Sequence, residues 1–156
     1  MRTAPGKPRI LVDADACPVR REAKRAAEEF AVEIIFFANQ AQEVDDGSRG
    51  EFVRVGDGSD AADFAILTRC DAGDVVITDD FGLAAMALGK GAAALSSRGR
   101  RFRPEEMPQL LQQRHAAAKA RRAGLRTRGP RGLKPDDRRR FVRSLSELLR
   151  VLGSEL

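Results

Sequence analysis

The chain has 156 residues, 33% of them charged, with 28 Lys and Arg against 23 Asp and Glu. That length fits one compact domain, and the share of apolar residues excludes a disordered or fibrous chain. No apolar run reaches the ~18 residues of a membrane span, so we expect a cytoplasmic protein.

Apolar runs alternate with helical periodicity over the first part of the chain. In chain order the pattern predicts a strand at 9–12, a helix at 18–30, a strand at 32–38, a polar loop at 40–50, a strand at 52–55, a helix at 60–70, a strand at 74–78, a helix at 81–89 and a strand at 92–95. Buried strands that alternate with helices require parallel crossovers. We therefore expect an α/β fold, a three-layer sandwich around a mainly parallel sheet of about four or five strands.

The remainder of the chain is predicted to be helical. A helix at 104–122 and a Gly- and Arg-rich loop at 123–134 precede an amphipathic helix at 135–152, whose inner side is expected to carry Phe141, Val142, Leu145, Leu148, Leu149 and Leu152. We expect residues 1–156 to form a single domain, on which residues 98–156 pack as a basic helical extension.

Charge is distributed unevenly along the chain. Residues 1–97 hold 11 Lys and Arg against 17 Asp and Glu, whereas residues 98–150 hold 17 basic and 5 acidic residues. So basic a segment predicts a phosphate-bearing partner such as RNA, although a solvated surface is the alternative. The candidate phosphate contacts are Asn39, Lys90, Arg98, Arg100, Arg101, Arg126, Arg128 and Arg131. With no Trp or Tyr, the chain lacks a platform for stacking bases, so we expect contacts to the nucleic-acid backbone.

Oxygen ligands follow every predicted strand of the first half. In an open parallel sheet, ligands bind beyond the carboxyl ends of the strands. Those ends carry Asp13 and Asp15, then Asn39, then Asp57, Asp60 and Asp63, and then Asp79 and Asp80. Carboxylates that converge repel one another, which a cation relieves, and oxygen ligands favour Mg²⁺ or Mn²⁺. The lone His115 lies far along the chain, which disfavours a zinc hydrolase.

Each of these acids also has a structural interpretation, because Asp commonly caps helices and forms turns. The candidates for capping are Asp15, Asp60, Asp63, Asp79 and Asp80, and Asp57 between two glycines fits an Asx turn. Asp13 differs from these acids, because it stands at the end of an apolar strand and too far before the next predicted helix to cap it. Capping explains one acid per helix, so we expect a functional role for the group.

Two further residues near these acids have structural interpretations that we favour. Cys17 at a predicted helix start could be a nucleophile, but two neighbouring aspartates disfavour its thiolate. Cys17 and Cys70 lie in unlike contexts, which argues against a disulfide framework or a thiolate zinc site. Lys90 stands between two glycines, where its charge suits the end of a helix.

Five segments occur in order over nearly the whole chain: VDADACPV, FFAN, VRVGDGSDAAD, VVITDDFGLAAMALGKGAAALSSRGR and TRGPRGLKPDDRRRF. Together they resemble the YaiI/YqxD family of uncharacterised bacterial proteins. That family in turn resembles PIN-like domains, whose known members are mostly metal-dependent ribonucleases. The resemblance implies that Asp13 matches the first PIN acid, Asp60 or Asp63 the helix acid, and Asp80 the acid that closes the step from Thr78.

The sequence therefore predicts a metal-dependent nuclease, and we expect its substrate to be RNA. Asp13, Asp80 and either Asp60 or Asp63 would hold one or two Mg²⁺ or Mn²⁺ ions, and a metal-bound water would attack the phosphodiester in line. The further candidate metal ligands are Asp15 and Asp79, and the residues expected to lie around the ligands are Cys17, Asp57 and Thr78.

Two other functions remain open. A strand followed by D-x-D and a later strand followed by DD also occur in haloacid-dehalogenase-type phosphatases, in which Asp13 would be the nucleophile and Asp15 the acid. Lys90 follows the DD step, however, where that class needs its lysine before it. The other alternative is a non-catalytic RNA-binding or toxin–antitoxin-like interaction module that keeps the acidic cleft. RNA binding without cleavage under Mn²⁺ would identify this module.

Overall fold

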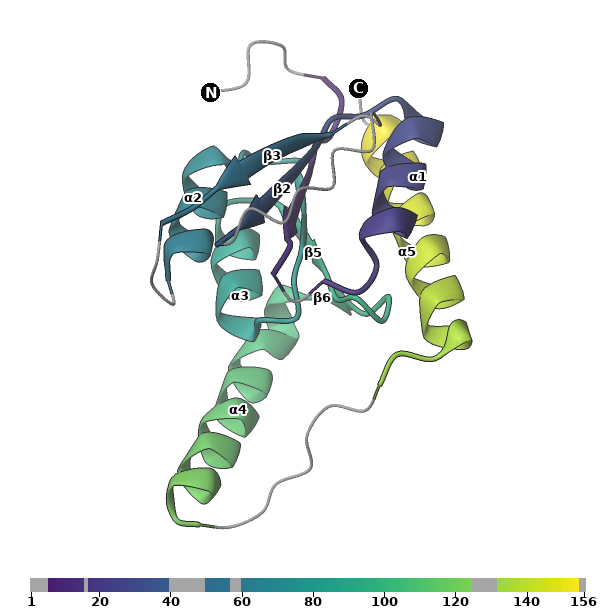
Figure 1. Cartoon of the computed structure of the whole chain (residues 1–156). Helices are drawn as coiled ribbons and strands as arrows, with labels where there is room; N and C mark the ends of the chain where they lie inside the picture. The colour runs from purple at the N-terminus through teal and green to yellow at the C-terminus, as the bar shows by residue number, and fades with distance from the viewer. Residues whose placement is uncertain (1–5, 16, 40–49, 57–59, 125–131, 155–156) are drawn as a thin grey trace.

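A computed structural model describes residues 6–15, 17–39, 50–56, 60–124 and 132–154 (Figure 1). Within them six strands form one sheet in the order β3-β2-β1-β4-β5-β6. The strands are β1 (Ile10–Asp13), β2 (Ile34–Ala38), β3 (Glu51–Arg54), β4 (Val75–Ile77), β5 (Ala93–Leu95) and β6 (Arg101–Phe102). Strands β1 to β5 are parallel, and β6 runs antiparallel to β5.

Helices cover both faces of this sheet, which confirms the predicted three-layer α/β sandwich. The helices are α1 (Arg20–Phe30), α2 (Ala61–Arg69), α3 (Phe81–Gly89), the short 3₁₀ helix η1 (Pro104–Glu106), α4 (Met107–Arg122) and α5 (Pro135–Ser154). Alternate side chains of a strand point to opposite faces. Ile10 and Val12 accordingly pack in one apolar cluster with α1 and α5, and Leu11 packs in another with α2 and α3.

Helix α5 lies against α1 and the sheet through the apolar side that the sequence predicts (Figure 1). Four of the expected inner residues are buried, namely Phe141, Leu145, Leu148 and Leu149, and Leu152 packs at their edge. The prediction is wrong for Val142, which is 39% exposed because it lies about 100° around the helix from Phe141, at the margin of the apolar stripe. None of the helices in the described residues is long and apolar enough to cross a membrane.

The structure also contains elements that the sequence analysis did not identify. Strand β6 is only two residues long, which is too short for a period of two to be recognised. The helix expected at 104–122 begins instead with the 3₁₀ turn η1, from which α4 continues. The expected strand, helix and loop boundaries elsewhere differ by one or two residues, and most of the loop at 40–50 lies outside the described residues.

The turn between β5 and β6 is held tightly against α5. Gly99 has a φ of +83°, and a Cβ atom there would lie 2.7 Å from the carbonyl carbon of Arg140. The Ser144 hydroxyl donates to the Gly99 carbonyl at 2.8 Å, and Arg98 pairs with the buried Asp137 at 2.9 Å. Only glycine suits both the backbone conformation and the close approach.

At the amino edge of the sheet, a buried ion pair joins β1 to β4. Arg9 Nη2 lies 2.9 Å from Asp74 Oδ2, and the Arg9 backbone N–H donates to Asp74 Oδ1 at 3.1 Å. Asp74 also accepts a bond from the Asp71 backbone N–H, so its buried carboxylate is well compensated. Arg9 and Asp74 at this amino edge therefore have a structural role, and a functional site is expected at the opposite, carboxyl edge of the sheet.

Candidate functional site

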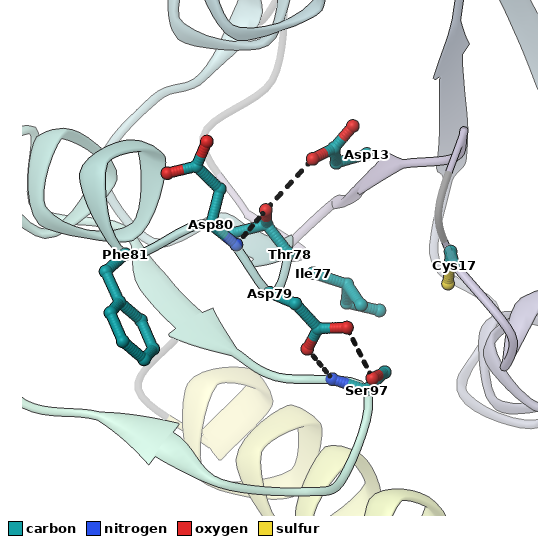
Figure 2. A pocket seen from close by; sticks show the side chains of 8 residues that line it. All are labelled: Asp13, Cys17, Ile77, Thr78, Asp79, Asp80, Phe81 and Ser97. Carbon is teal, nitrogen blue, oxygen red and sulfur yellow. Dashed lines mark hydrogen bonds between the residues drawn. The ribbon is translucent and has the colours of Figure 1, made fainter. Parts of the chain in front are cut away.

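A pocket lies where the strand order of the sheet reverses. From β1 the chain continues to β2 and β3 on one side, whereas β4 and β5 lie on the other side of β1. Connections diverge at such a switch point and leave a crevice beyond the carboxyl ends of the strands. The pocket there has a volume of about 440 Å³ and is lined by Asp13, Cys17, Ile77, Thr78, Asp79, Asp80, Phe81 and Ser97 (Figure 2).

Pairing of β1 with β4 places Asp13 and Thr78 together. Val12 is the partner of Ile77 in the parallel register, so the next residue of each strand stands at the mouth of the crevice. The Thr78 hydroxyl donates to Asp13 Oδ2 at 3.0 Å. Thr78 is buried, and this hydrogen bond holds the Asp13 carboxylate at the end of its strand.

Asp80 begins helix α3 and is joined to Asp13 through the same threonine. Its Oδ1 accepts from the backbone N–H groups of Gly82 at 2.8 Å and Leu83 at 3.3 Å, which makes it the N-cap. Its own backbone N–H donates to Thr78 Oγ1 at 3.0 Å. The Thr78 hydroxyl therefore donates to one acid and accepts from the backbone of the other.

Asp79 points away from Asp80, toward the turn that follows β5 (Figure 2). Ser97 donates to it twice, from its backbone N–H at 2.9 Å and from its hydroxyl at 2.6 Å. Both Asp79 oxygens are thereby engaged with the turn that α5 holds in place. The position of Asp79 and Ser97 in the pocket wall therefore depends on the contacts of Arg98 and Gly99 with α5.

The charges of three other carboxylates act on Asp13 at this edge of the sheet. Burial raises the pKa of Asp13 above its usual value, the hydrogen bond from Thr78 opposes that rise, and the charges of Asp80, Asp15 and Asp79 add to it. Because like charges in a partly buried crevice disfavour ionisation, either a proton or a cation would relieve the repulsion. The acids at the end of β4 thus lie close enough to Asp13, at the end of β1, for their charges to affect its ionisation.

The Cys17 thiol is unsuited to act as a nucleophile at neutral pH. Burial raises its pKa to about 11, with the charges of Asp79 and Asp13 adding to the effect. A thiol must ionise to become a good nucleophile. Asp13, one of the two aspartates expected to disfavour the thiolate, adds to the rise in the Cys17 pKa, but burial contributes more.

Comparison with known proteins assigns the chain to a family. The family model described as "Uncharacterized BCR, YaiI/YqxD family" matches residues 11–151. The chain belongs to the YaiI/YqxD family. It is 37% identical to a UPF0178 protein of Listeria welshimeri over 91% of this chain and 95% of that protein. A UPF0178 protein of Clostridium acetobutylicum is 38% identical over 90% of this chain and 96% of the relative. No solved structure was found to match.

The resemblance to this family is therefore confirmed, while its relation to PIN-like domains stays a prediction. A third relative, a UPF0178 protein of Bacillus cytotoxicus, is 40% identical over 90% of this chain and 92% of that protein. The names of these three relatives in the YaiI/YqxD family state no activity. Any function must be argued from the site.

Three of the other predicted acids of this family member, Asp15, Asp60 and Asp63, lie outside the pocket lining. Asp15 is exposed, and its Oδ2 accepts from the Asn39 backbone N–H at 2.8 Å, which ties the ends of β1 and β2 together. Asp60 stands at the N-cap position of α2 without a side-chain cap bond, and Asp63 lies in the first turn. Asp57 falls outside the described residues.

Metal-ligating groups are sparse at the pocket. Among the residues that the structure describes, no three or more His, Cys, Asp or Glu side chains lie together as a metal site. Of the predicted ligands, Asp13, Asp79 and Asp80 line the pocket, but Asp79 is turned toward Ser97. Asp13 and Asp80 are the two acids best placed to share an ion.

Three of the predicted phosphate contacts, Lys90, Arg98 and Arg100, have structural partners. Arg98 pairs with Asp137, and Arg100 pairs with Glu106 at 3.1 Å, whereas Arg101 is exposed on β6. Lys90 follows the last residue of α3, at the opposite end from Asp80, and its Nζ donates to the Leu67 carbonyl. Its position gives no support to the phosphatase alternative. Arg126, Arg128 and Arg131 lie outside the described residues.

Asn39 has a feature that the sequence could not indicate. Its side-chain Oδ1 is buried and has no hydrogen-bond partner among the residues that the structure describes, at the end of the strand beside β1. A buried polar atom left without a partner is costly. The amide oxygen is therefore an available acceptor or ligand at the carboxyl edge, next to Asp15.

Ser97 and Arg20 are site residues that the sequence analysis missed. Ser97 follows β5, so the rule that ligands lie beyond strand ends would have found it, had it been applied to the fifth strand. Arg20 donates from Nε to the Ala14 carbonyl at 3.1 Å, and its charge acts against the rise in the Cys17 pKa. No spacing in the sequence indicates that Arg20 would turn back toward β1.

Proposed function

We propose that this member of the YaiI/YqxD family is a divalent-metal-dependent nuclease that hydrolyses phosphodiesters, with RNA as substrate, at the pocket between β1 and β4. The observation that carries the proposal is the pairing of Asp13 and Asp80 at the switch point through one threonine hydroxyl. The raised pKa of Asp13 supports it, because a cation is the alternative to protonation for relieving clustered carboxylates.

The donor set at the pocket fits Mg²⁺ or Mn²⁺. All its candidate ligands are oxygens, which these hard ions prefer. Mg²⁺ commonly keeps several waters and binds through one or two carboxylates together with substrate phosphates. A pair of acids such as Asp13 and Asp80 is therefore sufficient. When bound, such an ion supplies positive charge for the phosphate and lowers the pKa of a bound water.

The surrounding residues support this pair of acids in distinct ways. Thr78 fixes the Asp13 carboxylate by donating to Oδ2, and the cap bonds fix Asp80 at the N-terminus of α3. The positive end of that helix dipole faces the same pocket and suits an anionic substrate. Cys17 remains a protonated thiol, so hydrolysis by water is favoured over a covalent route.

A cleavage assay with labelled single-stranded RNA and Mn²⁺ tests the proposal. Asp13→Asn and Asp80→Asn should each reduce the cleavage rate by about 100-fold or more, since each removes a ligand charge. Asp136→Asn is the matched control, because Asp136 is an exposed acid of α5 that does not line the pocket, and this variant should cut at the wild-type rate. Equal activity of wild type and both pocket variants would refute the nuclease.

One observation favours a second function, that of a non-catalytic RNA-binding module. Asp79 and Asp80 both accept hydrogen bonds that serve the fold, as structural acids do. In that case wild type would bind RNA but leave it intact with Mg²⁺, Mn²⁺ and other divalent ions. The same assay, read alongside a binding measurement, separates the two functions.

A further inference from the structure

Helix α4 extends away from the rest of the molecule (Figure 1). It begins beside α3 and η1, where Met107 and Leu110 are buried with Phe102 and Ala84. From Leu111 onward no described residue of the helix is buried. At 1.5 Å per residue, Leu111 to Arg122 make an arm about 18 Å long that extends beyond the buried contacts of Met107 and Leu110.

The exposed part of α4 is basic and has no acidic residue. Between Met107 and Gly124 the sequence contains Arg114, Lys119, Arg121 and Arg122 but neither Asp nor Glu. Lys119, Arg121 and Arg122 are all exposed and lie in the last turn of the helix. A helix that only needed solubility would normally mix both signs of charge, which also gives stabilising pairs between successive turns.

The sequence of the arm itself favours a helix. Ala116, Ala117, Ala118 and Ala120 have the highest helix propensity of any residue, and cations suit the C-terminal end of the helix dipole. The arm therefore presents its charges from a rigid rod. A rigid, preorganised surface loses little conformational entropy when it binds a partner.

We propose that α4 is an arm that binds the phosphate backbone of a nucleic-acid duplex. Its charge is complementary to a polyanion, and a duplex carries one negative charge per about 1.7 Å of its axis. The exposed part of the helix contains no Phe, Tyr or Trp, and His115 is the one ring side chain in its sequence. It therefore offers no series of aromatic side chains on which successive unpaired bases could stack, which is how single strands are usually held. Contacts to phosphates alone make the binding insensitive to base sequence.

The arm stands at the same edge of the molecule as the pocket. It leaves the body on the side toward which the parallel strands point (Figure 1), and helix α3, against which it packs, starts at Asp80. This inference deepens the proposed function and rests on it for one statement only, that the bound duplex leads into a site of cleavage. The nuclease would then act on structured substrates, at strands that adjoin a duplex.

Binding to labelled duplexes of RNA and of DNA, and to a single strand of the same sequence, tests the inference. The measurement uses the full chain with Asp13→Asn and EDTA, so that neither metal nor cleavage contributes. Replacing Lys119, Arg121 and Arg122 together with Gln should weaken duplex binding by about 10-fold or more. The log–log salt slope should fall by up to about 0.9 for each phosphate contact that is lost.

The matched control removes three charges from elsewhere on the surface. Lys7, Arg25 and Arg143 are exposed and lie outside α4, so their replacement by Gln changes the net charge equally. This control should bind duplex nearly as wild type does. Gln preserves helix propensity, and circular dichroism and the melting temperature verify that both triple variants fold.

Several results would overturn the inference. They are an unaltered affinity and salt slope in the α4 variant, an equal loss in the control variant, or single-strand binding as tight as duplex binding. Displacement of the duplex by polyglutamate as readily as by unlabelled duplex would indicate a general cationic surface instead. A preference between the two duplexes assigns the partner as RNA or DNA. If the α4 variant loses binding although wild type never cuts, the arm stands and the nuclease fails.

Discussion

At the scale of single residues, Thr78 connects the two acids of the pocket. Its one hydroxyl donates to Asp13 and accepts from the Asp80 backbone, so both directions of its hydrogen bonding are used. Each residue of the Thr78-Asp79-Asp80 segment after β4 therefore has its own structural role. The threonine sets where Asp13 points, the first aspartate holds Ser97, and the second caps α3.

Asp13→Asn should stabilise the metal-free protein at neutral pH. A carboxyl whose folded pKa is raised above its unfolded value destabilises the fold once it ionises, and this cost is complete above the folded pKa. The neutral amide avoids the cost. The advantage of the variant should shrink as the pH falls through the raised pKa and vanish below the usual value of 3.8.

Urea unfolding of wild type and Asp13→Asn across that pH range measures the effect. Asp136→Asn serves as control, because its exposed pair with Arg139 should contribute little at any pH. If Asp13→Asn were more stable than wild type by the same amount at every pH down to values below 3.8, ionisation of Asp13 would not be the cause of the difference.

At the scale of elements, the turn between β5 and β6 transmits the position of α5 to the pocket. Gly99 and Arg98 of the turn contact α5, and Ser97 of the same turn holds Asp79. Gly99→Ala should destabilise the protein by about 2 kcal/mol or more, since it adds a steric clash to a strained backbone. It should also reduce cleavage, because Asp79 loses its fixed partner.

The control for this prediction is Gly73→Ala. Gly73 has a similar φ of +87°, but a Cβ atom there meets nothing within 4 Å, so only backbone strain is added. Denaturant unfolding of both variants separates strain from clash. Equal losses of stability in the two would show that the contact with α5 is unimportant.

At the scale of the whole molecule, metal binding should stabilise the fold. At a Mn²⁺ concentration about 100 times its dissociation constant, linkage gives about 2.7 kcal/mol. For a chain of this size that corresponds to roughly 5–10 °C in melting temperature. The double variant Asp13→Asn with Asp80→Asn should lose the increase, as a thermal melt would show. An unchanged response would place the metal elsewhere, and Asp60→Asn would test the predicted ligand at the N-cap of α2.

Sequence reasoning predicted the layers of the fold and the central pair of acids, but not which strand ends meet. The prediction that Asp13 and Asp80 lie at the same edge of the sheet was correct, because the carboxyl ends of parallel strands lie on the same side. Asp60 and Asp63 follow β3, which lies two strands from β1, or about 10 Å across the sheet. The order of strands in space depends on long-range packing, as do the return of Arg20 to Ala14 and the contact of Ser97 with Asp79. None of these contacts leaves a local signal.

The contact between Gly99 and α5 has a consequence for synthesis on the ribosome. Translation produces every lining residue of the pocket by Ser97, well before the helix at Pro135–Ser154 exists. Until that helix emerges and docks, the turn that carries Ser97 has no surface to rest on, and α1 lacks its neighbour. An unfinished chain would thus display the acids without a formed pocket. The nuclease proposed above would in that case be inactive while it is still surrounded by messenger and ribosomal RNA.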